Sequence, residues 1–431
     1  MSDPIADETP VDEEPSPEQP AAAPAREPGR LQRIGRRITS ASPFTVTVLS
    51  IVSALVVGAI LIVVSNGPVM SQFAYFFARP STALSGAWTA IANAYGDLFK
   101  GAVVDPSAVS AAIHGTGSWS DALFSISETL KYAAPLIFTG LAVSVAFRGG
   151  LFNIGAQGQA IFGAIGAGLV GFEIKLPVVL HLIVALLAAA VGGALFGFIP
   201  GILKARTGAH EVIVTIMLNN IALLFLGWLI TQPGVQEVGR SDAISKNVHS
   251  SAMLPHIMGS RLNANLGLIL GLAAVVVVGW LMNRSTFGFE LRAVGSNPHA
   301  ARTAGMSVGR TYVLVMVLAG ALAGLGGASI LLGTAGQLTG GVVGNIGSDG
   351  ITVALLGRGK PWGVVWSSLL FGGLYAGGNR MQSYDHITVD FIYVLQAVIV
   401  IFIAAPMLIK TIFRLRADRS AQLSASLAKG W

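Results

Sequence analysis

The stretch 153–172, NIGAQGQAIFGAIGAGLVGF, has the length of one membrane crossing but mixes apolar residues with glycines and amides. On a helix, Asn153 and Gln157 lie four residues apart on one face, and Gln159 is beside them. Amides near one end of a crossing are costly unless water, a solute or another helix satisfies them. We therefore weigh two interpretations: a polar pathway through the membrane, or close helix packing through small residues.

The composition places most of the chain in a bilayer. Of 431 residues, 53% are hydrophobic and 11% are charged, against roughly 25% charged in a soluble domain. The absence of cysteine excludes disulfides, thiolate metal sites and a cysteine nucleophile. The net charge of +6 lies mainly in segments on one side of the predicted membrane. It therefore indicates orientation, and we expect no nucleic-acid partner.

The apolar runs predict an all-α, polytopic membrane protein with about ten crossings. The predicted crossings are 44–64, 124–146, 153–172, 177–199, 211–231, 264–282, 311–333, 338–357, 362–379 and 388–408. An even number puts both termini on one side, and the lysine and arginine bias assigns that side to the cytoplasm. Crossing 338–357 is too rich in glycine and polar residues to face lipid, so we expect protein or a cavity to enclose it.

The segments outside the 44–410 transmembrane domain have distinct compositions. Residues 1–43 are rich in proline and acid, which predicts a disordered cytoplasmic tail. A basic patch beside anionic lipid ends this tail, and residues 411–431 form a second basic cytoplasmic tail; the patch comprises Arg30, Arg33, Arg36 and Arg37. Segment 65–122 faces outward, and its aromatic residues predict surface-lying helices with a packing or vestibule role.

A second string resembles the first one. NIGAQG at 153–158 is echoed by NIGSDG at 345–350. One opens a predicted crossing from the inside and the other from the outside, which indicates an inverted repeat of crossings 2–5 and 7–10 with the solute path between them. Asp349 then corresponds to Gln157. A carboxylate in the membrane is a candidate functional group, but Asp349 could equally cap the helix that follows it.

Polar residues also occur in 206–229, RTGAHEVIVTIMLNNIALLFLGWL. Glu211 complements the dipole of the helix that it begins. Thr215 and Asn219 share its face, with Asn220 beside them, and we weigh hydrogen bonds inside the bundle and pathway contacts equally. Uncharged amides suit a neutral polyhydroxylated or heteroaromatic solute better than an ion. The candidate pathway residues are Asn153, Gln157, Gln159, Thr215, Asn219, Asn220 and Asp349.

A charged segment, FELRAVGSNPHAARTAGMSVGR at 289–310, interrupts the apolar sequence between crossings six and seven, within the cytoplasmic loop 283–310. Ser296 or Asn297 can cap a short helix there, Pro298 fits its first turn and Gly305 can end it. So short a helix is not stable alone in water. Lipid headgroups or a partner protein must hold it, and its small residues suit docking against a protein.

Four motifs together resemble the permease subunit of a bacterial ABC importer. They are GLFNIGAQGQ at 150–159, EVIVTIMLNNIA at 211–222, LRAVGSNPHAARTAGM at 291–306 and DGITVALLGRGKPWG at 349–363. The resemblance runs from about residue 80 to 410 and is to the branch of nucleoside, simple-sugar and branched-chain amino-acid permeases. It implies that the loop between crossings six and seven is a coupling helix for an ATPase, through Arg292, Gly295, Asn297, Ala300, Ala301 and Gly305. Family members often have glutamate at the position of Gln157.

The resemblance also implies partners and a mechanism. It implies a cytoplasmic ABC ATPase, a second and related permease chain, an extracytoplasmic substrate-binding lipoprotein and alternating access, with nucleosides favoured as the solute. A simple-sugar permease is the alternative, and an ion-coupled secondary transporter is the alternative from another class. No G-x-x-x-x-G-K-[ST] motif, metal-spaced histidine pair or nucleophile–base arrangement is visible. We therefore expect no enzymatic activity, metal or cofactor in this chain.

Overall fold

The computed structural model describes residues 43–385, 387–388 and 390–414, and these fold into α-helices with no β-strand, as predicted. Most of the two predicted tails, with the basic patch of the first, lies outside the described residues. The helices are α2 (Pro43–Ser65), α3 (Gly67–Phe73), α4 (Pro80–Ala102), α5 (Pro106–Ile113), α6 (Trp119–Arg148), α7 (Ala156–Glu173), α8 (Val178–Thr207), α9 (Glu211–Leu229), α10 (Gly267–Arg284), α11 (Thr286–Ser296), α12 (Pro298–Thr303), α13 (Val308–Ile330), α14 (Ile346–Leu356), α15 (Pro361–Asp385), α16 (Asp390–Ala404) and α17 (Pro406–Ile412).

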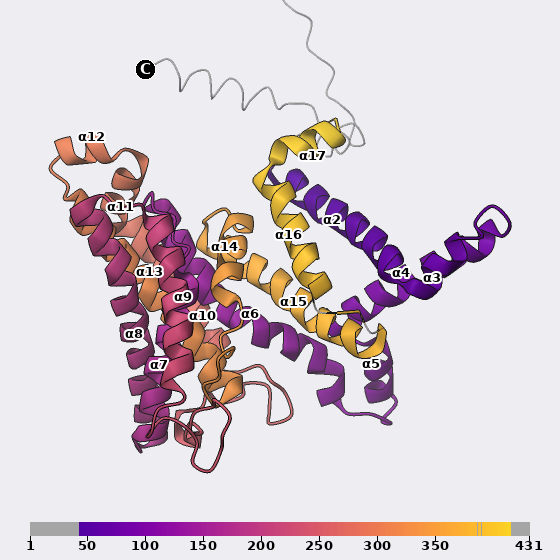
Figure 1. Ribbon diagram of the computed structural model, residues 1–431, viewed down its shortest axis with the longest axis horizontal. Coiled ribbons are helices and arrows are strands. Elements are labelled where there is room, and N and C mark those ends of the chain that lie inside the picture. The colour runs from indigo at the N-terminus through magenta and orange to yellow at the C-terminus, as the bar shows by residue number, and fades with distance from the viewer. Residues whose placement is uncertain (1–42, 386, 389, 415–431) are drawn as a thin grey trace, which may run out of the picture.

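Figure 1 shows an upright bundle that includes α7, α8, α9 and α13, from which α6 and α15 lead to a second group formed by α2, α3, α4 and α16. Six helices of the described chain are long and apolar enough to cross a membrane: α2, α6, α8, α9, α10 and α13. Helices α7 and α15 have 18 and 25 residues but more polar sequences, and both are largely buried. The chain is therefore a multi-pass membrane protein.

Two of the predicted crossings are not continuous helices. Helix α14 has 11 residues, which gives about 16 Å against the roughly 30 Å of a bilayer core. The prediction of a single helix over 338–357 is wrong because glycines at positive φ, including Gly336 and Gly344, keep 336–345 irregular. Crossing 388–408 is divided into α16 and α17, since Pro406 lacks the N–H that would continue the helix.

The packing of the helices agrees with the predicted inverted repeat. If α6–α9 correspond to α13–α16, each contact should have a counterpart with the two halves exchanged. Helix α8 packs on α13 and α15 packs on α6; α7 packs on α13 and α14 packs on α6. The first turns of α7 and α14 meet at Gly347, where a Cβ atom would lie 2.1 Å from the Gln157 nitrogen. NIGAQG and NIGSDG therefore face one another inside the bundle.

Small residues allow helices of this bundle to approach one another closely. Helices α8 and α13 touch along Gly193, Gly320 and Gly324, and a Cβ atom at Gly324 would lie 2.3 Å from the Ala189 oxygen. In membranes, such close backbone approach replaces the hydrophobic driving force between helices. A side chain at these positions would separate α8 from α13.

Helix α4 differs from the surface helix predicted for segment 65–122. It packs against α15, α6 and α2, and its Gly101 lies against Gly377 of α15. The Tyr95 hydroxyl donates to the Leu55 oxygen of α2. Helix α4 is therefore packed against other helices of the protein, although Trp88 keeps an exposed aromatic side chain.

Candidate solute pathway

A cavity of about 310 Å³ lies between α6, the end of α13, α15 and the start of α14. Its walls come from α6, the π-helical turn Leu331–Ala335, the irregular segment 341–345, α14, α15 and α16. Part of segment 338–357 therefore lines a cavity, as predicted for a stretch that cannot face lipid. The side chains that give the cavity its chemistry are Lys131, Tyr132, Thr334, Asn345, Asp349, Tyr375, Asn379 and Tyr393.

Three tyrosines form one side of this cavity. The ring centroids of Tyr132 and Tyr375 are 5.8 Å apart, and those of Tyr375 and Tyr393 are 5.9 Å apart in an edge-to-face arrangement. Asn379 Nδ2 donates to the Tyr132 hydroxyl at 2.8 Å, and the Tyr375 hydroxyl donates to Asp349 Oδ2 at 2.7 Å. Hydrogen bonds therefore hold Tyr132 and Tyr375 in place, and the three rings give the cavity an aromatic side.

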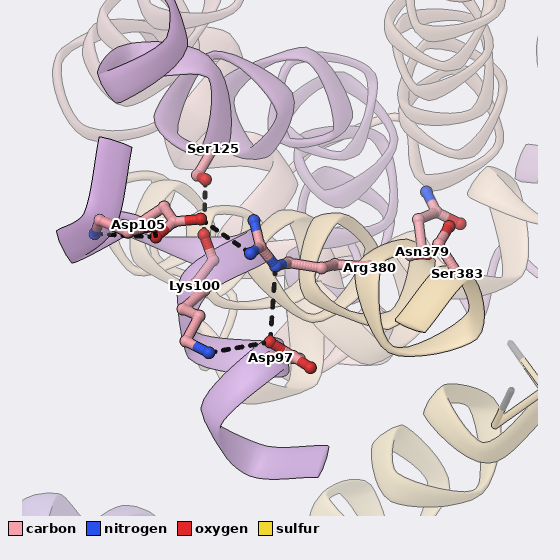
Figure 2. A network of polar contacts seen from close by, with 8 residues as sticks. Asp97, Lys100, Asp105, Ser125, Asn379, Arg380 and Ser383 are labelled. Atoms are coloured by element: carbon pink, nitrogen blue, oxygen red, sulfur yellow. Dashed lines mark hydrogen bonds and ion pairs between the residues drawn. The ribbon is translucent and has the colours of Figure 1, made fainter. Parts of the chain in front are cut away.

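An ion-pair network fixes the C-terminal part of α15 beside the cavity. Figure 2 shows Arg380 reaching toward Asp97 and Asp105, while Asn379 lies on the same helix. Arg380 Nη2 is 2.7 Å from Asp105 Oδ2, and its Nε is 3.6 Å from Asp97 Oδ1. Lys100 pairs with Asp97 at 3.1 Å. Because Arg380 follows Asn379 directly, this network links α4 and α5 to the cavity wall.

Lys131 contributes an ion-paired side chain to the edge of the same cavity. Its Nζ lies 4.5 Å from the centroid of the Tyr132 ring and 2.5 Å from Glu128 Oε2. Glu128 also accepts a hydrogen bond from Asn263. The positive charge is therefore neutralised within the protein, and the cavity keeps a neutral edge here.

The amides predicted on α7 and α9 gather outside this cavity. Asn153 and Gln159 are buried and exchange two amide hydrogen bonds, at 2.9 and 3.2 Å. Asn219 donates to the Ile154 oxygen and accepts from the Gly158 nitrogen, both at 2.9 Å. Thr215 is buried and bonds to its own helix at the Glu211 oxygen. Of these side chains, Asn219 joins the start of α7 to α9.

Asn220 is exposed, unlike its neighbour. Its Nδ2 donates to the Ile216 oxygen of the same helix at 3.2 Å.

Helix α7 begins at Ala156, after Asn153. The prediction that Asn153 continues the helical face of Gln157 is therefore wrong, because Asn153 belongs to the turn that precedes the helix.

Gln157 and Asp349 have different roles although they occupy corresponding positions. Gln157 Nε2 donates to the Gly344 oxygen, and its Oε1 accepts from the Gly347 nitrogen at 2.8 Å. Gln157 therefore joins the two halves of the repeat and holds Gly344, which lines the cavity. Asp349 lines the cavity itself. The interpretation of Asp349 as only a helix cap does not describe this position, because its bonded oxygen binds Tyr375.

Sequence reasoning missed the tyrosines and Asn379. They lie far apart in the sequence, on α6, α15 and α16, so only the fold brings them together. A signal was nevertheless present in GGLYAGGNR at 372–380, where Tyr375 and Asn379 lie four residues apart within a predicted crossing.

The loop between α10 and α13 forms the two short helices α11 and α12, at the end of the bundle opposite the loops that follow α9 (Figure 1). Asn297 Oδ1 accepts from the His299 and Ala300 nitrogens, both at 3.1 Å. Pro298 begins α12, and Gly305 follows it with φ +84°. The predicted capping is therefore confirmed, with Asn297 as the cap.

The predicted coupling residues divide into buried and exposed ones. Ala301 is 4% exposed and packs with Val294 and Val308. Gly295 lies so close to α6 that a Cβ atom would be 2.3 Å from the Arg148 oxygen. Ala300 is exposed. Asn297 and Gly305 are exposed as well, and Arg292 is partly buried with its Nη1 enclosed.

The comparison with known families shows which family the chain belongs to. The family model described as "Branched-chain amino acid transport system / permease component" matches residues 125–404. The chain belongs to this permease family. It is 40% identical over 289 residues to the guanosine ABC transporter permease NupP of Bacillus subtilis, with 66% of this chain and 82% of NupP covered.

Two further relatives are similar over nearly the same share of the chain. The nucleoside ABC transporter permease NupB of Lactococcus lactis is 38% identical, with 66% of this chain and 80% of NupB covered. The glucose ABC transporter permease TsgB13 of Haloferax volcanii is 34% identical, with 65% of this chain and 76% of TsgB13 covered. No solved structure matches the chain. The chain is a transport subunit, as its family is one of permease components.

Proposed function

We propose that the chain is the membrane-spanning permease subunit of an ATP-driven ABC importer and that its solutes are nucleosides. The observation behind this proposal is the cavity that joins Tyr132, Tyr375 and Tyr393 to Asp349 and Asn379. Its 310 Å³ lies at the lower end of the range of small-molecule sites. Aromatic faces suit a base, and the carboxylate and amide suit a sugar.

The names of the relatives support the same solute class. NupP is named for guanosine and NupB for nucleosides. The glucose permease TsgB13 keeps a simple sugar as the second candidate, and the polar floor of the cavity would suit a sugar as well. The three tyrosines favour a nucleoside, because a flat base covers more of their surface than a hexose does.

Transport in this proposal proceeds by alternating access. A substrate-binding lipoprotein delivers the solute on the outer side, and a separate ABC ATPase acts on α11 and α12. Their exposed residues, including Asn297, Ala300 and Gly305, are the contact surface, while Arg292, Gly295 and Ala301 transmit its movement to α6 and α13. Both termini are cytoplasmic, and this chain binds no cofactor.

A second permease completes the pathway in this proposal. Bacillus subtilis has two permeases named for guanosine, NupP and NupQ; this chain is 40% identical to the first and 27% identical to the second. That difference supports a related but distinct partner chain. The partner would cover the exposed irregular segment around Gly340, Gly341 and Gly344, whose backbone polar groups cannot face lipid.

Reconstitution tests the function directly. The permease, its partner permease, the ATPase and the lipoprotein are placed in proteoliposomes, and uptake of labelled guanosine and glucose is measured with and without ATP. We expect ATP-dependent nucleoside uptake that persists when proton and sodium gradients are collapsed. Uptake of glucose alone would support the sugar alternative, and loss of uptake with the gradients would support a secondary transporter.

A further inference from the structure

Asp349 is a charged group with unused hydrogen-bonding capacity in the cavity. It is 9% exposed, and its Oδ2 accepts a hydrogen bond from the Tyr375 hydroxyl. A carboxylate offers about four acceptor sites. Lys131 lines the same cavity but pairs with Glu128. Within the described part of the chain, no cationic side chain forms an ion pair with Asp349.

Asp349 and Gln157 occupy corresponding positions of the inverted repeat but differ in their hydrogen bonds. Gln157, at the corresponding position, uses a donor and an acceptor to hold Gly344 and Gly347. An ionised carboxylate has no donor and cannot make the same bridge. Asp349 instead lies on the cavity wall, next to the segment that Gln157 holds. A buried charge is costly unless hydrogen bonds satisfy it, so the position suits a group that receives donors from a solute.

The aromatic and polar groups of the cavity come from different elements. Tyr132, Tyr375 and Tyr393 lie on α6, α15 and α16, whereas Asn345 and Asp349 belong to the segment that begins α14. Two adjacent hydroxyl groups of a sugar can both donate to one carboxylate, and acidic side chains recognise ribose hydroxyls in other proteins.

We propose that Asp349 is a specificity-determining residue that binds the adjacent 2′- and 3′-hydroxyls of the ribose, while the tyrosines receive the base. This inference rests on the proposed function. It predicts that the permease itself selects ribonucleosides over 2′-deoxynucleosides, in addition to any selection by the lipoprotein. Removing one hydroxyl leaves a buried carboxylate oxygen without a donor, which is the situation in which polar sites discriminate strongly.

The test compares Asp349→Asn with wild type in the complete reconstituted complex. The same lipoprotein is used throughout, so that its own selectivity cancels. The measured quantity is the ratio of the guanosine uptake rate to the 2′-deoxyguanosine uptake rate. We expect Asp349→Asn to lower this ratio at least fivefold. The matched control is Asp242→Asn, an exposed carboxylate paired with Arg240 in an outer loop, which should leave the ratio unchanged.

A second measurement covers an Asp349→Asn complex that does not transport. Because the chain has no cysteine, Thr334→Cys places a single thiol in the cavity wall. In this background, guanosine should slow thiol modification at a lower concentration than 2′-deoxyguanosine does, and Asp349→Asn should remove that difference. An unchanged ratio of rates, or an unchanged difference in protection, would overturn the role of Asp349. A wild-type complex that imports no nucleoside would instead refute the proposed function.

Discussion

Replacing Gln157 with alanine should weaken the contact between the two halves of the inverted repeat. The side chain makes two hydrogen bonds across this contact, to the Gly344 oxygen and from the Gly347 nitrogen. Hydrogen bonds within membrane proteins contribute about 0.6 kcal/mol each on average. The substitution also leaves the buried Gly347 N–H without its acceptor, which costs a further ~1–3 kcal/mol. The expected destabilisation is therefore about 2–4 kcal/mol.

The assay is thermal unfolding of the purified permease complex in detergent, with ATP-driven uptake measured in parallel. The matched control is Asn220→Ala, which also removes an amide, but one that is exposed and bonds to its own helix. We expect the Gln157 variant to unfold at a clearly lower temperature and the Asn220 variant to resemble wild type. Equal unfolding temperatures for the two variants would refute the reasoning, because the bridge would then contribute nothing.

Three further predictions concern the α11–α12 loop and the ion-pair network around Arg380. Ala300→Arg should reduce uptake per ATP at normal abundance, whereas Ala301→Arg should lower abundance itself, since Ala301 is buried; immunoblots and ATPase rates distinguish them. Asn297→Ala should cost about 1 kcal/mol of stability through loss of the α12 cap, measured by thermal unfolding. Hydrogen bonds from Ser107, then the Arg380 guanidinium, lower the pKa of Asp105. Its contribution is therefore fully present above the ordinary value of 3.8 and is lost as pH falls through the lowered pKa. Asp105→Asn should therefore differ from wild type in unfolding at pH 7, and the difference should narrow only below pH 3.8 and vanish below the lowered pKa.

Local chemistry in the sequence predicted the parts of the structure that depend on neighbouring residues. The helix after Asn297 follows from a capping side chain, a proline and a glycine within nine residues. The inverted repeat was visible as two similar strings in opposite orientation, and the packing of α6–α9 and α13–α16 agrees with it.

The cavity could not be predicted because it depends on distant helices. Tyr132 and Tyr375 are separated by more than half of the chain, and each alone resembles an ordinary aromatic residue of a membrane helix. The prediction that Asn153 and Gln157 share one helical face failed for a related reason. Asn153 and Gln159 satisfy one another once α7 starts at Ala156, an arrangement that a continuous helix would not allow.

The most direct test asks whether solute enters the cavity. A complex with Thr334→Cys as its single permease cysteine is treated with a thiol reagent from the outside during ATP-driven transport, with and without guanosine. The account predicts that guanosine slows modification at this position and leaves a cysteine at the exposed outer-loop position Val238 unaffected. Equal modification rates at Thr334→Cys with and without guanosine, in a complex that imports guanosine, would contradict it.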